Sequence, residues 1–131
     1  MVLDPCRGDG AFYDQYPDHV DRRWCEFNQG RDFLDWLAPV QWIITNPPWS
    51  KLREFLVRAM MVADNVVFLM TLVHISTKAR LADMRRAGFG LREVFMVPEP
   101  RTGWPWSGFQ LAAIHFQRGW DGPCSFTGEP N

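Results

Sequence analysis

The chain has 131 residues, 47% of them hydrophobic and 15% aromatic, which suffices for the core of one domain and argues against global disorder. Its formal net charge is −1 at pH 7, so any binding to nucleic acid requires a local basic patch or a partner. The longest apolar run, 66–70, is far shorter than the roughly 20 residues of a membrane span, and no signal peptide or disulfide framework is visible. We expect a cytoplasmic protein with no membrane segment and, since its Cys and His residues lack ligand spacing, no metal site.

The first third of the chain predicts short strands joined by tight turns. Residues 2–3 indicate a buried strand that ends at Asp4-Pro5, and glycines at 8 and 10 then open a helix over about 11–16. Strands are expected over 23–27 and 42–45, with a further strand or a short turn over 32–37. Prolines at 47 and 48 must end the strand 42–45, because proline cannot donate to a strand ladder.

The rest of the chain alternates helices and strands. Apolar residues at helical spacing predict an amphipathic helix over 52–63, with Ser50 as its N-cap. A strand over 66–71, a basic helix over 77–87 and strands over 91–97 and 110–117 follow, with a long loop between the last two. This order predicts one α/β domain over 1–118 and an irregular tail over 119–131. We expect an open, mostly parallel, twisted sheet with helices on both faces and a ligand site at the carboxyl ends of its strands.

A glycine-containing turn follows the first strand and has the residue types of a nucleoside-binding loop. Gly8 and Gly10 allow a ligand to approach the backbone, and Asp4 offers a carboxylate at the strand end. Glu26 follows at a distance typical of the acid that holds two ribose hydroxyls in nucleotide-binding folds. Asp32-Phe33 can offer a carboxylate and a ring to an adenine base. Taken singly, each of these residues also fits an ordinary loop or surface position.

The most specific pattern is Asn46-Pro47-Pro48-Trp49, which ends a buried strand and precedes a helix. The prolines fix the backbone and leave carbonyl groups as rigidly placed acceptors. An exocyclic NH2 group that donates to the Asn46 side chain and the Pro47 carbonyl gains lone-pair density on nitrogen, while Trp49 offers a stacking face. The alternative is an ordinary strand-to-helix turn with a core tryptophan.

These two motifs together resemble those of the class I S-adenosylmethionine-dependent amino-methyltransferases, especially the N6-adenine DNA methyltransferases with an Asn-Pro-Pro-aromatic catalytic loop. The resemblance covers most of the chain and implies a single Rossmann-like methyltransferase domain with an antiparallel last strand over 110–117. It implies that S-adenosylmethionine is bound by residues of the first motif and of the two segments after it, namely Asp4, Pro5, Gly8, Gly10, Phe12, Glu26, Asp32 and Phe33. It implies that the target base is held by Asn46, Pro47, Pro48 and Trp49.

The resemblance leaves the substrate open. The same catalytic loop occurs in enzymes that methylate RNA guanine or protein glutamine, since each substrate presents a planar NH2 group. Compared with the family, the chain has little sequence before its first strand and lacks a target-recognition domain. DNA is the favoured substrate, and the expected setting is a restriction–modification system or a phage. A specificity subunit or a homodimer would supply sequence recognition. The non-enzymatic alternative is a remnant that binds cofactor or DNA without transferring a methyl group.

Two segments are candidates for contact with nucleic acid. The basic stretch 78–92 can form a phosphate-binding face or a solvated helix surface, and the loop 101–108 offers two tryptophans that can stack on bases or belong to a core or interface. The candidate contact residues are Lys51, Arg85, Arg86, Arg101, Trp104 and Trp106.

Overall fold

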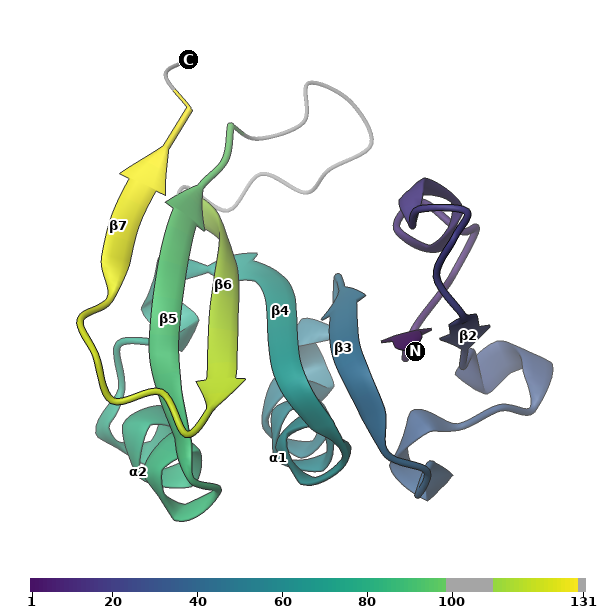
Figure 1. Ribbon diagram of the computed structural model, residues 1–131, viewed down its shortest axis with the longest axis horizontal. Helices are drawn as coiled ribbons and strands as arrows, with labels where there is room; N and C mark the ends of the chain where they lie inside the picture. The colour runs from purple at the N-terminus through teal and green to yellow at the C-terminus, as the bar shows by residue number, and fades with distance from the viewer. Residues whose placement is uncertain (99–109, 130–131) are drawn as a thin grey trace.

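Short apolar stretches separated by turns form one seven-stranded sheet within the residues that the computed structural model describes, 1–98 and 110–129 (Figure 1). The strands lie side by side in the order β2-β1-β3-β4-β6-β5-β7. Their bounds are β1 (Val2–Asp4), β2 (Arg22–Trp24), β3 (Val40–Thr45), β4 (Ala63–Thr71), β5 (Phe89–Met96), β6 (Leu111–Arg118) and β7 (Ser125–Gly128).

Strand β6 is antiparallel to its neighbours β4 and β5, whereas the other pairings between these strands are parallel. The predicted Rossmann-like sheet, mostly parallel with one reversed strand, is therefore confirmed. The reversed strand is not the last one, because β7 follows it and pairs with β5 from Glu93↔Ser125 to Met96↔Gly128. The prediction of an irregular tail from residue 119 onward was thus wrong for residues 125–128, which form β7. Its four residues are exposed and show no apolar alternation, so only their pairing with β5 reveals the strand.

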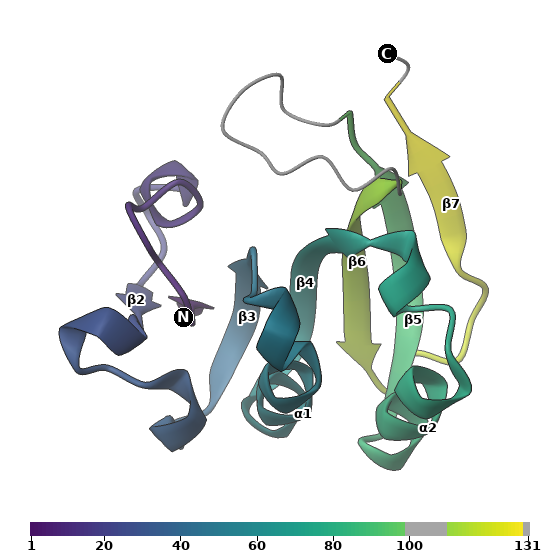
Figure 2. The same ribbon diagram turned by 180° about the vertical axis from the view of Figure 1, so that it is seen from behind.

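Helices α1 (Leu52–Val62) and α2 (Lys78–Arg86) lie side by side on one face of the sheet (Figure 2). The predicted apolar stripe of α1 is buried against the sheet. In the sheet, Ile43 of β3, Val66 of β4 and Phe116 of β6 are adjacent in register, and all three are fully buried. Strand alternation places Trp42 and His115 on the opposite face, where both are half-buried and their ring centroids lie 5.2 Å apart.

The expectation of helices on both faces was met on one face only, as far as the described residues go. The chain after β1 and β2 forms short 3₁₀ turns, η1 (Tyr13–Gln15), η2 (Phe27–Gln29) and η3 (Phe33–Asp35), in place of longer helices. The helix expected over 11–16 is therefore reduced to η1. These segments are rich in Gly, Pro and Asp, which favour turns over helix interiors.

Two further 3₁₀ turns follow strand ends, η4 (Trp49–Lys51) after β3 and η5 (Leu72–His74) after β4. Because η4 continues directly into α1, the N-cap of that helix is Lys51 and not Ser50 as expected. The turns η4 and η5 and the chain leaving β1 lie together at the carboxyl end of the parallel strands, where the sequence predicted the ligand site (Figure 1). Within the described residues, no helix has the length and apolarity needed to cross a membrane.

Candidate functional site

A cavity of about 400 Å³ opens at the carboxyl ends of β1 and β3. Its wall is contributed by the turn after β1, by η2 and η3, and by the chain from Asn46 into α1. The cavity is lined by Pro5, Cys6, Glu26, Phe27, Asn28, Asp32, Phe33, Asn46, Pro47, Pro48, Ser50, Lys51 and Phe55. The structure thus brings together residues from both motifs identified in the sequence.

A buried polar network fixes the ends of β1 and β3 to each other below this cavity. The Asp4 carboxylate accepts hydrogen bonds from the Thr45 hydroxyl at 2.6 Å and from the Cys6 N–H at 3.2 Å. The Cys6 thiol in turn donates to the Asn46 backbone carbonyl at 3.1 Å. Asp4 is only 1% exposed and lies behind the cavity wall, so its expected contact with the cofactor stays a prediction.

Burial dominates the protonation of this network. It raises the pKa of the Asp4 carboxyl above its usual range despite the Thr45 and Cys6 hydrogen bonds, and no ion pair to Asp4 is formed within residues 1–98 and 110–129. Burial also raises the pKa of the Cys6 thiol to about 12, which keeps it protonated and able to donate to Asn46.

The glycine turn supports the cavity from behind. The Glu26 carboxylate lines the cavity and accepts hydrogen bonds from the backbone N–H groups of Gly8 at 2.9 Å and Asn28 at 3.1 Å. Gly10 has a φ of 93°, and a Cβ atom there would lie 2.7 Å from an Asp14 carboxylate oxygen, so the turn requires glycine at this position. Gly8, Gly10 and Phe12 are not among the residues that line the cavity, and their expected role in cofactor binding stays a prediction.

Asp32 and Phe33 lie where a base-binding pair was expected. The Asp32 side chain caps η3 by accepting from the Leu34 N–H at 3.0 Å, and it also faces the cavity. Phe33 is 1% exposed and packs against Phe55 of α1, with ring centroids 5.3 Å apart. Phe27 forms a further aromatic wall and is 67% exposed.

The catalytic-loop candidates separate onto two sides of one turn. Asn46, Pro47 and Pro48 line the cavity, and within the described part of the chain the Asn46 side-chain amide has no hydrogen-bond partner. Trp49 does not line the cavity, because its indole N–H donates to the Leu69 carbonyl on β4 at 3.4 Å and its ring meets His74 edge-on at 5.7 Å. The loop therefore presents the Asn46 amide to the cavity and places the Trp49 indole outside it.

The predicted nucleic-acid contacts are dispersed. Lys51 lines the cavity and places its ammonium 5.3 Å from the Phe27 ring centroid. Arg85 and Arg86 end α2 just before β5 begins, at the opposite end of the sheet from the cavity (Figure 1), and Arg86 is paired with Asp83 at 3.3 Å. Arg101, Trp104 and Trp106 lie outside the described residues.

Several residues of the site were not predicted from the sequence, namely Cys6, Thr45, Phe27 and His74. Thr45 and Cys6 belong to the strand and turn that were recognised, and alternation along β3 together with the Asp4 position could have indicated the contact across the two strand ends. His74 approaches Trp49 only because η5 follows the neighbouring strand, a contact that no local pattern reveals.

Comparison with known proteins identifies the fold. No protein-family model matches the sequence, and no curated protein matches it. Solved structures do match, and they show that the chain has the fold of class I methyltransferases. A Pyrococcus horikoshii protein described as an RNA methyltransferase superposes with a TM-score of 0.67 at 17% identity, covering 89% of this chain and 72% of that one.

Two other solved structures are longer than this chain. A Listeria monocytogenes protein described as a class I S-adenosylmethionine-dependent methyltransferase gives a TM-score of 0.63 at 11% identity, covering 97% of this chain and 57% of that one. A chain from a type I restriction–modification system gives 0.58 at 16% identity, covering 99% of this chain and 40% of that one. At these identities the likeness establishes the fold, and the substrate has to be inferred from the site.

Proposed function

We propose that this chain binds S-adenosylmethionine and transfers its methyl group to an exocyclic amino nitrogen, with N6 of adenine in DNA as the target. The observation that carries the proposal is the Asn46 side-chain amide, which has no hydrogen-bond partner within the described residues and lines a ligand-sized cavity beside the rigid Pro47-Pro48 backbone. This amide is half-buried and accessible to solvent, so its oxygen can accept a hydrogen bond from a ligand that enters the cavity.

The residues of the cavity suit the proposed cofactor. A volume of about 400 Å³ lies within the usual range for small-molecule sites. The exposed ring of Phe27 offers an apolar wall for a base, and the Glu26 and Asp32 carboxylates offer acceptors for ribose hydroxyls and an adenine amino group. When bound, S-adenosylmethionine supplies a methyl group activated by its positively charged sulfonium.

The chain's own residues then position the nucleophile. The Asn46 side-chain oxygen and the Pro47 carbonyl accept the two protons of a planar NH2 group, which orients its lone pair and excludes water from it. The Cys6 thiol donates a hydrogen bond to the backbone carbonyl of Asn46. In the proposed complex, the side-chain oxygen of Asn46 is the acceptor for the substrate. On the other side of the loop Trp49, held by the Leu69 carbonyl, supplies a ring on which the target base stacks.

DNA, RNA and protein glutamine all offer a suitable NH2 group, so the substrate is best tested directly. Purified protein is incubated with methyl-labelled S-adenosylmethionine and separate pools of DNA, RNA and protein, and the labelled product is identified. We expect N6-methyladenine in DNA, with single-stranded DNA used more readily because extruding a base from a duplex costs a few kcal/mol. If label appears only in RNA or only in protein, that polymer is the substrate and the assignment to DNA is wrong. If none of the three pools is labelled, the result contradicts methyl transfer.

The first prediction concerns Asn46. Asn46→Ala should lower the single-turnover rate of methyl transfer by roughly 10²–10³, the usual loss for one pre-organised hydrogen bond to a reacting group. Affinity for S-adenosylhomocysteine should stay near the parental value, because the walls of the cavity remain. Asn46→Asp is the matched variant, since it keeps an acceptor oxygen and should retain more activity than the alanine. A near-parental rate for Asn46→Ala would reduce the Asn-Pro-Pro-Trp loop to a structural turn.

A further inference from the structure

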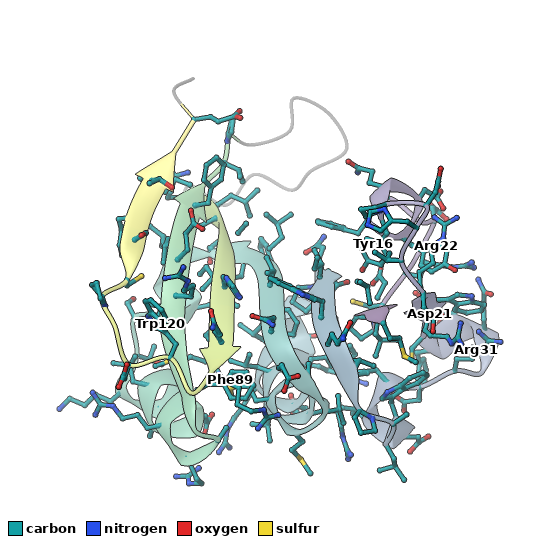
Figure 3. The ribbon with its side chains drawn as sticks, in the orientation of Figure 1. Tyr16, Asp21, Arg22, Arg31, Phe89 and Trp120 are labelled. Carbon is teal, nitrogen blue, oxygen red and sulfur yellow. The ribbon has the colours of Figure 1, made fainter. Side chains whose placement is uncertain are left out.

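A second cavity, of about 570 Å³, lies along the outer side of the edge strand β2. It is separate from the proposed cofactor cavity, although both share Asp32 through the segment that joins β2 to η3. Figure 3 shows Arg22 and Arg31 at this outer edge of the molecule, away from α1 and α2. The wall of this second cavity contains mainly aromatic and charged side chains. It consists of Tyr13, Arg22, Arg23, Trp24, Cys25, Gly30, Arg31, Asp32, Asp35 and Trp36.

The arginines at this cavity are held by stacking on aromatic rings. The Arg31 guanidinium carbon lies 3.9 Å from the Trp24 ring centroid, and that of Arg7, which is not among the lining residues, lies at the same distance from that ring. Arg22 lies 5.1 Å from the ring centroid of Tyr13. A guanidinium stacked on a ring keeps the N–H donors around its edge available, so these contacts fix the groups in place without using their hydrogen-bonding capacity.

The charges of these arginines are not neutralised by carboxylates. Within the described residues, Arg7, Arg22 and Arg31 form no ion pair, and only Arg23 is paired, with Asp21. Arg22 and Arg7 each donate one long hydrogen bond of 3.4 Å, to the Tyr13 carbonyl and to Gln29. The basic face of α2 differs in this respect, because Asp83 is shared by arginines 53, 80 and 86.

The two carboxylates of the cavity offset part of this charge, and the three lining arginines and two lining aspartates together carry a formal charge of +1. Asp32 accepts from the Leu34 N–H as the cap of η3 and keeps its negative charge. Asp35 is exposed, and its side chain makes no hydrogen bond or ion pair within residues 1–98 and 110–129. A free carboxylate beside aromatic rings can accept from the amino group of a nucleobase, so it complements a ligand that carries both phosphate and base.

We propose that this cavity, formed around Arg22, Arg31 and Trp24, binds the phosphodiester backbone of a single-stranded nucleic acid. Planar guanidinium groups match phosphate oxygens, and alternating aromatic and basic side chains are the typical surface for single strands. This proposal rests on the proposed function, because the second cavity would hold a nucleic-acid substrate next to the cofactor cavity, with which it shares Asp32. The lining of the cavity carries a formal charge of +1, in a chain whose net charge is −1.

Binding is tested without cofactor or methyl transfer. The full chain is titrated into a short fluorescein-labelled single-stranded DNA, and into RNA of the same sequence, while anisotropy is recorded at several salt concentrations. Arg22→Gln/Arg31→Gln should reduce the slope of log Kd against log salt by about 1.4, at about 0.7 for each lost phosphate contact, and weaken binding on the order of tenfold. Comparing DNA with RNA shows which polymer supplies the backbone.

Lys78→Gln/Arg85→Gln is the variant of the competing candidate surface, since it removes two charges from exposed residues of α2 that form no ion pair within the described residues. Circular dichroism establishes that both double variants are folded. The proposal is overturned if the two variants weaken binding equally, if neither weakens it, or if inorganic phosphate binds this cavity while neither oligonucleotide does. Failure of methyl transfer leaves this result unaffected, because the titration contains no cofactor.

Discussion

Two buried aspartates in this fold have opposite electrostatic surroundings. Asp83 faces Arg53, Arg80 and Arg86, and the hydrogen bond from Arg53 is the main cause that lowers the pKa of its carboxyl below the usual range. Asp4 faces a hydroxyl and a backbone N–H, and burial raises its pKa. A carboxyl that the fold buries without a compensating cation is more often part of a functional site than of a stabilising pair.

The stability of an Asp4→Asn variant should follow from this surrounding. The asparagine oxygen can still accept from Thr45 and Cys6, while the cost of burying a charge disappears. Because the folded-state pKa of Asp4 is raised, its favourable contribution exists at low pH and is lost as pH rises through the folded-state pKa. We therefore expect Asp4→Asn to equal or exceed the parent in free energy of unfolding at pH 7. The advantage should shrink toward pH 3.8, the ordinary carboxyl value.

Urea unfolding at both pH values measures this difference. Thr45→Val serves as the companion variant, because it removes the hydroxyl donor and leaves the Asp4 carboxylate with the Cys6 N–H alone of the two bonds described. That variant should be less stable than the parent at pH 7. A clear loss of stability in Asp4→Asn at pH 7 would show that the charge itself stabilises the fold.

At the scale of elements, the contact between α1 and α2 depends on one ion-pair cluster. Arg53 of α1 donates to the Asp83 carboxylate from Nε at 3.0 Å and from Nη2 at 3.2 Å. Asp83 is 5% exposed, whereas the Arg53 and Arg86 side chains are mostly exposed. Water screens these two arginines, so the cluster stabilises the fold less than a fully buried pair would.

Asp83→Asn should lower the free energy of unfolding by about 1–2 kcal/mol at neutral pH, since it removes the charge that holds three arginines together. The pKa of Asp83 is lowered in the folded state, so its contribution exists above pH 3.8 and is lost as pH falls through the folded-state pKa. The difference between parent and variant should therefore vanish in acid, and at neutral pH its sign should be opposite to that expected for Asp4→Asn. Thermal unfolding across this range measures it, and a difference that is independent of pH would contradict the electrostatic explanation.

Elements with a strong local pattern could be predicted from the sequence. The apolar spacing from Leu52 to Met60 predicts α1, and the Thr77 side chain caps α2 by accepting from the Arg80 N–H. Strand β7 and the turn η1 could not be predicted, because pairing with β5 and the Asp14–Gly10 turn, respectively, decide their conformation. These are tertiary or turn-specific contacts that override weak local preference.

The candidate site shows the same limit. The position of Asn46 and of Glu26 at strand ends followed from the sequence, and the structure brings both to one cavity. The sequence did not predict on which side of the loop Trp49 lies, because this depends on contacts with Leu69 of β4 and His74 of η5. The second cavity assembles residues from 13 to 36 around β2, and no local pattern in the sequence predicted it.

At the scale of the whole molecule, the carboxyl ends of β1 and β3 bring together two sets of residues with different proposed roles. The chain through η3 supplies Glu26, Asp32 and the aromatic walls of the cavity, and the chain from Asn46 onward supplies the loop proposed to hold the target amine. The Asp4–Thr45 hydrogen bond joins the two parts at the ends of β1 and β3. Substitutions in the first part should therefore change cofactor binding, and those in the second should change transfer.

Glu26 tests this division through the stability of the entire domain. A ligand that binds only the folded state raises the free energy of unfolding by about 2.7 kcal/mol at a hundredfold excess over Kd, so S-adenosylhomocysteine should raise the unfolding temperature of the parent. Glu26→Ala should lose most of this increase, because the proposed ribose acceptors and the Gly8 and Asn28 bonds disappear together. Glu26→Gln keeps one acceptor oxygen and should retain part of the increase. Asn46→Ala should retain all of it. Differential scanning fluorimetry of the four proteins with and without ligand measures these shifts, and an equal increase in Glu26→Ala and the parent would remove Glu26 from the cofactor site.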